Sequence, residues 1–208
     1  MSALPANELL FARVAQAVRP LHDPPAGPGW NHAELRDVLG DAVRRPAAVL
    51  VALIPRSEGP SVLFTERTAH LSQHAGQVSF PGGAIEPDDT DAVAAALRET
   101  FEEVGIAPAL VRPFGFLDRF ETISGYNVTP VVAELDPGYR SVPDPREVAA
   151  VFEAPLAFFL DPRNLKSRRI EWRGRPREIH DFPFRGHNIW GATAAMLLSL
   201  ARRLETTT

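Results

Sequence analysis

The stretch that decides the fold is PGGAIEPDDTDAVAAALRETFEEVGI, residues 81–106. Residues 91–104 have helical periodicity, and on an α-helix, at about 100° per residue, Glu99, Glu102 and Glu103 fall on one face. Apolar side chains fall on the opposite face, namely Val93, Leu97, Phe101 and Val104. The pattern predicts a helix with one face in the core and a carboxylate cluster on the other.

These glutamates stand where an isolated helix disfavours them. Like charges three and four residues apart destabilise a helix by about 0.2–0.5 kcal/mol per pair, and the helix dipole disfavours anions near the C-terminal end. A hard divalent cation reverses that penalty, since Mg²⁺ takes oxygen ligands from a few carboxylates and from substrate phosphates. Gly82 and Gly83, just before the helix, permit close backbone approach to an anion. A solvated acidic helix after a glycine turn is the alternative interpretation.

The rest of the 208-residue chain mixes strands and helices without strict alternation. AAVLVALIP (47–55) predicts a strand buried on both faces, and Gly105 is a plausible end for the helix of the acidic cluster. Further strands are expected at 61–67, 112–120, 128–135 and 168–182, a strand with a helical turn at 146–160, and a last helix at 189–204. The expected fold class is α+β with a mixed sheet.

The N-terminal part combines a short helical pattern with a segment rich in proline and glycine. Residues 6–18 place apolar side chains on one side of a helix, and RPLHDPPAGPG (19–29) holds four prolines and two glycines in eleven positions. Such a segment reads as an extended linker packed on a surface. We expect one domain over 1–208, in which 1–29 is an N-terminal helix with a proline-rich arm and 45–204 holds the acidic helix and the other strands and helices.

Composition excludes several classes of protein. The net charge of −4 argues against non-specific nucleic-acid binding, and no apolar run approaches the ~18 residues that cross a bilayer. The chain has no cysteine, which excludes disulfide scaffolds and thiolate chemistry. The N-terminus does not resemble a secretory signal, and a cytoplasmic location is expected. Of the 22 basic residues 21 are arginine, a bias that fits genomic composition or phosphate binding.

Residues 83–106 resemble the Nudix box, the signature of the Nudix hydrolase family. The positions that match are Arg98, Glu99, Glu102, Glu103, Gly105 and Ile106. Thr100 stands where the box has an aliphatic residue. The glycine-to-arginine spacing is one residue longer than in the common box, so Glu86, Asp88 or Asp89 takes the early acidic position.

The resemblance implies an α/β/α sandwich and a metal-dependent reaction. It implies that Glu99 and Glu103, with Glu102, bind Mg²⁺ or Mn²⁺, and that Arg98 orients a glutamate. Water then attacks a diphosphate linked to another moiety, with metal ions neutralising the diphosphate and activating the water. The general base stays open between Glu103 and a carboxylate outside the box, for which Glu121 is a candidate.

The segment before the box indicates a substrate. LFTERTAHLSQHAGQVSFPGG (63–83) resembles the motif of the coenzyme A pyrophosphatase branch of the family. The resemblance implies cleavage of coenzyme A or acyl-coenzyme A to 3′,5′-ADP and (acyl-)4′-phosphopantetheine, with Arg67, Gly82 and Gly83 near the substrate. Thr68 is a mild departure. Ser72 stands where the branch has a basic residue, and the missing charge is left to Arg67, Arg119 or an arginine of 168–177.

Two other functions and several residues stay open. An ADP-ribose or NADH-type diphosphatase is the first alternative, and a non-catalytic nucleotide-sensing module is the second. His70 and His74 suit loop hydrogen bonds or phosphate contact better than metal binding. Tyr126 and Trp190 are expected to pack, although an aromatic ring there can stack on adenine. The last helix is core or dimer interface, so the chain is a monomer or a homodimer, and no nucleic acid or membrane partner is expected.

Overall fold

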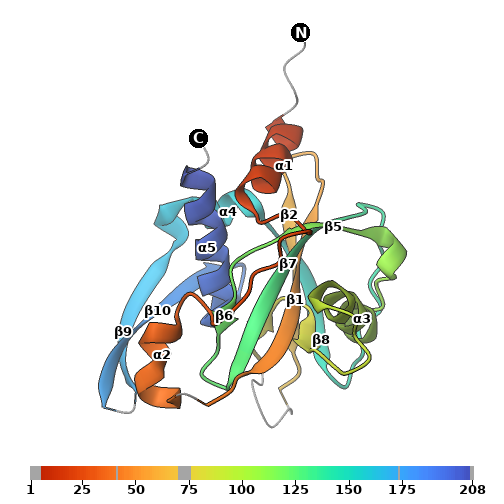
Figure 1. The fold of residues 1–208 in the computed structure, drawn as a ribbon. Coiled ribbons are helices and arrows are strands. Elements are labelled where there is room, and N and C mark those ends of the chain that lie inside the picture. The colour runs from red at the N-terminus through yellow and green to blue at the C-terminus, as the bar shows by residue number, and fades with distance from the viewer. Residues whose placement is uncertain (1–5, 41, 70–75, 173, 207–208) are drawn as a thin grey trace.

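The structure, a computed structural model, describes residues 6–40, 42–69, 76–172 and 174–206 (Figure 1). Its main feature is a mixed sheet with helices on both faces, which confirms the expected α+β sandwich. The helices are α1 (Ala6–Ala17), α2 (His32–Leu39), α3 (Ala92–Val104), α4 (Leu156–Leu160) and α5 (Ala192–Thr206), with short 3-10 turns η1 (Pro108–Leu110) and η2 (Pro162–Asn164).

The central sheet has the strand order β3-β2-β1-β7-β5, and β4, β6 and β8 pair with β1, β7 and β2. The pairing of β1 with β7 is parallel and the other pairings are antiparallel. The strands are β1 (Arg45–Ile54), β2 (Ser61–Arg67), β3 (Val78–Ser79), β4 (Gly82–Ala84), β5 (Val111–Phe116), β6 (Phe120–Glu121), β7 (Tyr126–Leu135) and β8 (Val148–Pro155). A second sheet holds β9 (Lys166–Trp172), β10 (Arg175–Phe184) and β11 (His187–Trp190).

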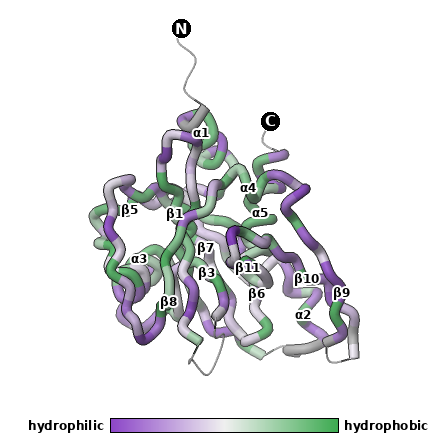
Figure 2. Tube along the Cα trace, turned by 180° about the vertical axis from the view of Figure 1, so that it is seen from behind, coloured by the Kyte–Doolittle hydropathy of each residue, from purple (hydrophilic) through white to green (hydrophobic). Residues whose placement is uncertain are grey.

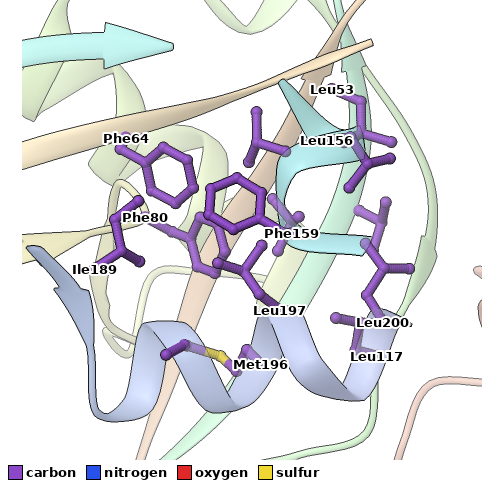
Figure 3. Close-up of a cluster of buried hydrophobic side chains, with 14 of the residues drawn as sticks. Leu53, Phe64, Phe80, Leu117, Leu156, Phe159, Ile189, Met196, Leu197 and Leu200 are labelled. Carbon is purple, nitrogen blue, oxygen red and sulfur yellow. The ribbon is translucent and has the colours of Figure 1, made fainter. Parts of the chain in front are cut away.

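Each face of the central sheet has its own core. On one face α1, α4 and α5 cover a cluster that includes Val14, Phe64 and Phe159, and Figure 3 shows this cluster against α5. On the other face α3 packs through Ala95 and Ala96. β1 contributes to both clusters, as its unbroken apolar sequence predicted.

The apolar stripe of α5 lies in the core of its own chain. Met196, Leu197, Leu200 and Leu204 are at most 4% exposed. Of the two roles left open for this helix, the structure therefore gives it the core role. No helix in the described ranges combines the length and apolar character needed to cross a membrane.

Helix α3 has the ends that the sequence predicts, but the prediction for one of its core residues is wrong. The Asp91 side chain accepts a hydrogen bond from the Ala94 N–H and caps the start, and Gly105, at φ +67°, closes the end in a left-handed conformation. Phe101, expected in the core, is 53% exposed. Thr100 is fully buried instead, and its hydroxyl donates to the Ala96 carbonyl at 2.6 Å. The small residues on that side let α3 lie close to the sheet.

Other expectations are confirmed with changed boundaries. The strand expected over 112–120 is two strands, β5 and β6, and the last helix starts only at Ala192 because 187–190 form β11. Helix α2 was not predicted. The proline-rich segment 19–29 contains no helix, but it is not extended throughout as expected, because a turn at 20–23 and bends at 27–28 interrupt it. Arg19 pairs with Phe116 beside β5. Figure 2 shows the hydrophilic character of the β9–β10 hairpin.

Candidate active site

The site forms where α3 crosses the short strand β4. The Gly82 N–H donates to Glu103 Oε2 at 3.1 Å. A Cβ on Gly83 would lie 2.5 Å from the carboxyl carbon of Glu99. The two glycines therefore leave room for two carboxylates of α3 to lie against the backbone of β4.

Glu103 is the most buried carboxylate of the box. It is 4% exposed, and this burial raises its pKa to about 7 against the opposing effects of the Gly82 N–H and the positive charge of Arg67. Arg67 Nη1 lies 3.6 Å from Glu103 Oε1. Burial also raises the pKa of Glu99, against the hydrogen bond and charge of Arg98. Burial disfavours the ionised form of both carboxyls, and a cation bound nearby would favour that form again.

Arg98 bonds to three carboxylates of the candidate site. Its Nε and Nη2 donate to the two oxygens of Asp89 at 3.0 and 2.9 Å, and its Nη1 lies 3.0 Å from both Glu99 and Glu102. The bond from Arg98 holds the pKa of Asp89 below its usual value although burial opposes this. Of the three candidates for the early acidic position, Asp89 is the one that accepts hydrogen bonds from Arg98. The Glu86 backbone N–H also donates to the Asp89 side chain.

A fourth carboxylate, Glu147, was missed by the sequence analysis. Its negative charge raises the pKa of both Glu99 and Glu103. Glu147 lies just before β8, and its carbonyl accepts from the Thr68 N–H at the end of β2. No motif marks it, because the antiparallel pairing of β2 with β8 brings it to the site.

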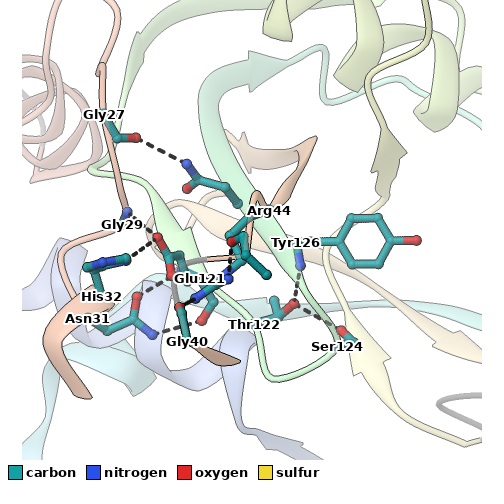
Figure 4. A network of polar contacts seen from close by, with 12 residues as sticks. Gly27, Gly29, Asn31, His32, Gly40, Arg44, Glu121, Thr122, Ser124 and Tyr126 are labelled. Atoms are coloured by element: carbon teal, nitrogen blue, oxygen red, sulfur yellow. Dashed lines mark hydrogen bonds and ion pairs between the residues drawn. The ribbon is translucent and has the colours of Figure 1, made fainter. Parts of the chain in front are cut away.

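Glu121, the candidate base outside the box, has another place. Its Oε1 accepts from the Gly29 N–H at 3.2 Å and lies 2.9 Å from His32 Nδ1, and its Oε2 accepts from Arg44 Nε at 3.1 Å (Figure 4). Burial raises the pKa of this carboxyl, but the His32 and Gly29 bonds outweigh burial and hold it below the usual value. Asn31 also bonds to the Glu121 backbone. Both oxygens hold the N-terminal segment against β6, and we do not propose Glu121 as a base.

Three of the arginines left open for a further phosphate charge have protein partners. Arg119 donates to the Gly27 carbonyl, Arg168 pairs with Asp181, and Arg177 pairs with Asp37 of α2. Arg67 Nε is buried without a hydrogen-bond partner among the described residues, as are Arg119 Nε and Arg177 Nε. Arg67 differs from those two in its position, because its guanidinium faces Glu103.

The remaining candidates are placed as follows. His70, Ser72 and His74 lie outside the described residues. Tyr126 lies under the guanidinium of Arg45, 5.4 Å from its ring centroid, and its side chain is labelled in Figure 4. Trp190 pairs with Asp181 in the β10–β11 ladder.

The carboxylate oxygens gathered at this site are the kind of ligand that a hard divalent cation prefers. The negative charges of Glu99 and Glu147 raise the pKa of Glu103, and those of Glu102 and Glu147 raise the pKa of Glu99, so these carboxylates are close enough to be neutralised together. Within the described part of the chain no three His, Asp or Glu side chains already form a metal-binding group. Arg98 holds Glu99 and Glu102 on one of its nitrogens, and Glu102 is 55% exposed.

Comparison with known proteins identifies the family. The family model described as the NUDIX domain matches residues 44–175. The chain belongs to the Nudix family. It is 40% identical over 169 residues to the "Uncharacterized Nudix hydrolase NudL" of Enterobacter sp. strain 638, covering 81% of this chain and 86% of that protein. It is 42% identical over 162 residues to the protein of that name from Escherichia coli O6:H1, covering 77% and 83%.

A solved Nudix hydrolase, RenU from M. smegmatis, is also similar, with a TM-score of 0.47 and 23% identity over 56% of this chain and 73% of that chain. The family assignment makes this chain a Nudix hydrolase that acts on a phosphate anhydride. Nudix hydrolases generally use divalent ions such as Mg²⁺ or Mn²⁺.

Proposed function

We propose that this Nudix hydrolase cleaves the diphosphate of coenzyme A or acyl-coenzyme A. Water adds across one P–O bond of the anhydride, and the products are 3′,5′-ADP and 4′-phosphopantetheine or its acyl form. Support for the substrate comes from the segment 63–83, which resembles that branch of the family. In this proposal residues 1–208 act as one catalytic domain; the cytoplasmic location and the monomer or homodimer state stay predictions.

One observation carries the reaction: Glu103, which is buried, and Glu99, which is half-buried, lie against Gly82 and Gly83. In the proposal Glu99 and Glu103, with Glu102, hold Mg²⁺ or Mn²⁺, and Arg98 positions them. When bound, the ion neutralises diphosphate charge and lowers the pKa of its water.

The residues of the chain supply the other functions. Arg67 has an unpartnered Nε beside Glu103 and is suited to hold a phosphate oxygen with its planar fork. The proton of the attacking water goes to Glu103 or to Glu147, whose charges lie in the same cluster. The backbone of Gly82 and Gly83 lies next to these groups and lines the place of the substrate.

The test is product analysis by chromatography with Mg²⁺ and, separately, Mn²⁺. The substrates are coenzyme A, acetyl-coenzyme A, ADP-ribose and NADH, and Glu103→Gln is the blank. We expect 3′,5′-ADP from the first two substrates and none from the variant. Absence of turnover on all four, with nucleotide binding retained, would favour the non-catalytic sensing module.

A second candidate substrate class is ADP-ribose or a dinucleotide such as NADH. One observation favours it: Ser72 replaces the basic residue of the coenzyme A motif. Turnover of ADP-ribose or NADH alone would keep the reaction and reject coenzyme A.

A further inference from the structure

Four aromatic rings form a series that leads from the core to the surface. Phe80 and Phe64 have centroids 5.3 Å apart at 23°, and Phe64 and Phe152 are 5.5 Å apart at 25°. The ring of His187 then lies on Phe152, with centroids 3.9 Å apart and planes only 7° from parallel. Phe64 is fully buried, and Figure 3 shows it with Phe80 inside the cluster. The His187 side chain, by contrast, is 27% exposed.

The His187 imidazole is fixed in one orientation. Its Nδ1 lies 2.8 Å from Glu66 Oε2. An ionised carboxylate only accepts, so Nδ1 is the donor, and Nε2 is left as the other polar atom of the ring. His187 follows the tight turn at Arg185–Gly186, where both residues have positive φ. A ring that is stacked and hydrogen-bonded loses little freedom when a ligand stacks on it.

This ring lies close to the proposed active site. Its partner Glu66 directly precedes Arg67, whose guanidinium faces Glu103. The pairing of β2 with β8 is irregular between Glu66 and Arg67, and a bulge of this kind redirects the side chains at a strand end. A diphosphate held at Arg67 can therefore extend its attached group past this strand end toward His187.

We infer that His187 is the stacking residue for the nucleobase of the substrate, with Phe152 behind it and Glu66 holding its orientation. The inference rests on the proposed nucleoside diphosphate substrate and deepens it, since it assigns the end of the molecule that carries the base. Base-binding proteins use Phe, Tyr, Trp and His rings in this way. The sequence had suggested Tyr126 or Trp190 for this role, but Tyr126 already lies against a guanidinium.

The direct test is proton NMR on the metal-free full-length chain. It has six histidines, and the spectrum of His187→Phe assigns the His187 signal. The probes are adenosine 5′-monophosphate, which has a base and no anhydride, and ribose 5-phosphate. We expect an upfield ring-current shift of the His187 Hε1 signal with the nucleotide only. A signal that does not move, or that moves equally with both probes, overturns the inference.

The kinetic test separates stacking from a structural role. For His187→Ala we expect KM for coenzyme A to rise about tenfold, the size of one lost base–aromatic stack, with kcat within about twofold. His187→Phe keeps a ring and restores most of the affinity, and a dialkyl diphosphate without a base is cleaved equally by all three proteins. His180→Ala, which changes another half-buried histidine, is the matched control. An unchanged KM for His187→Ala overturns the inference.

The two proposals fail in different ways. If coenzyme A is not cleaved but the His187 signal shifts with the nucleotide, the stacking residue stands and only the substrate assignment falls. If coenzyme A is cleaved and neither the NMR signal nor KM responds, the enzyme proposal stands and the stacking residue falls.

Discussion

Gly82 and Gly83 are adjacent in the sequence, but substitution by alanine should affect mainly stability at Gly82 and mainly activity at Gly83. At Gly82, φ is +151° and a Cβ would lie 2.3 Å from the Ala48 carbonyl oxygen of β1, which cannot move without breaking the sheet. At Gly83 the obstacle is the flexible end of Glu99. We expect Gly82→Ala to cost at least about 2 kcal/mol of stability, and Gly83→Ala at most about 1 kcal/mol.

For activity we expect a large effect from Gly83→Ala, the variant that costs little stability. Gly83→Ala displaces the Glu99 carboxylate, so kcat/KM should fall at least about tenfold in a folded protein. Urea unfolding and initial rates measure the two effects. Full activity in Gly83→Ala would contradict the placement of Glu99 in the site.

The raised pKa of Glu103 makes stability depend on pH. The folded protein, with a pKa of about 7, holds the proton more tightly than the unfolded chain at about 4.5. This contribution is present below pH 4.5 and is lost as pH rises through 7. Without metal, Glu103→Gln should therefore gain stability over the parent protein by roughly 2–3 kcal/mol more at pH 8 than at pH 5.

The measurement is urea unfolding of both proteins with a chelator at the two pH values. Glu102→Gln is the control, because Glu102 is 55% exposed, and its stability difference from the parent should change little. An equal gain for Glu103→Gln at both pH values would show that burial does not hold the proton on Glu103.

At the scale of elements, Glu121 is an anchor for the segment around α2. Glu121→Gln keeps the shape of the side chain but leaves the Arg44 guanidinium, whose side chain is 6% exposed, without its counter-charge. We expect a loss of about 3 kcal/mol in stability and a kcat within about threefold of the parent at a temperature where both are folded. His32→Ala should cost less, since His32 is 35% exposed. A fall in kcat of a hundredfold in folded Glu121→Gln would restore it as a catalytic candidate.

The elements that could be predicted from the sequence are those with local signals. Helix α3 carries its own cap at Asp91 and its own stop at Gly105, and β1 is apolar throughout, so both were predicted within a few residues. Helix α2 has eight residues and is held by distant partners, Glu121 and Arg177, which no local pattern shows.

The candidate site also has residues that the sequence could predict and residues that it could not. Arg98 and the box glutamates share one helix, and helical spacing alone gathered them. The choice of Asp89 among three acids and the presence of Glu147 depend on how loops fold back onto α3. The exposure of Phe101 has the same origin, because the approach of β1 and β4 decides which side of α3 is buried.

For the whole molecule, the proposed site is assembled from three separate parts of the chain. Helix α3 supplies Glu99 and Glu103, the end of β2 supplies Arg67, and the loop before β8 supplies Glu147. Their carboxylates repel one another in the folded state, and unfolding separates them. A cation bound at this site therefore stabilises the native arrangement and has no equivalent site in the unfolded chain.

The last prediction follows from that linkage. A ligand of the native state at a hundred times its Kd adds about 2.7 kcal/mol, which in a chain of this size raises Tm by about 5–10 °C. We expect this rise with Mg²⁺ or Mn²⁺ at pH 8, measured by calorimetry against a chelator. Glu103→Gln should start from a higher Tm without metal, because it lacks the buried charge, and should gain less than half of the rise. An equal rise in both proteins would place the ion elsewhere, because the carboxylate that destabilises the empty site is the one that the proposal gives to the metal.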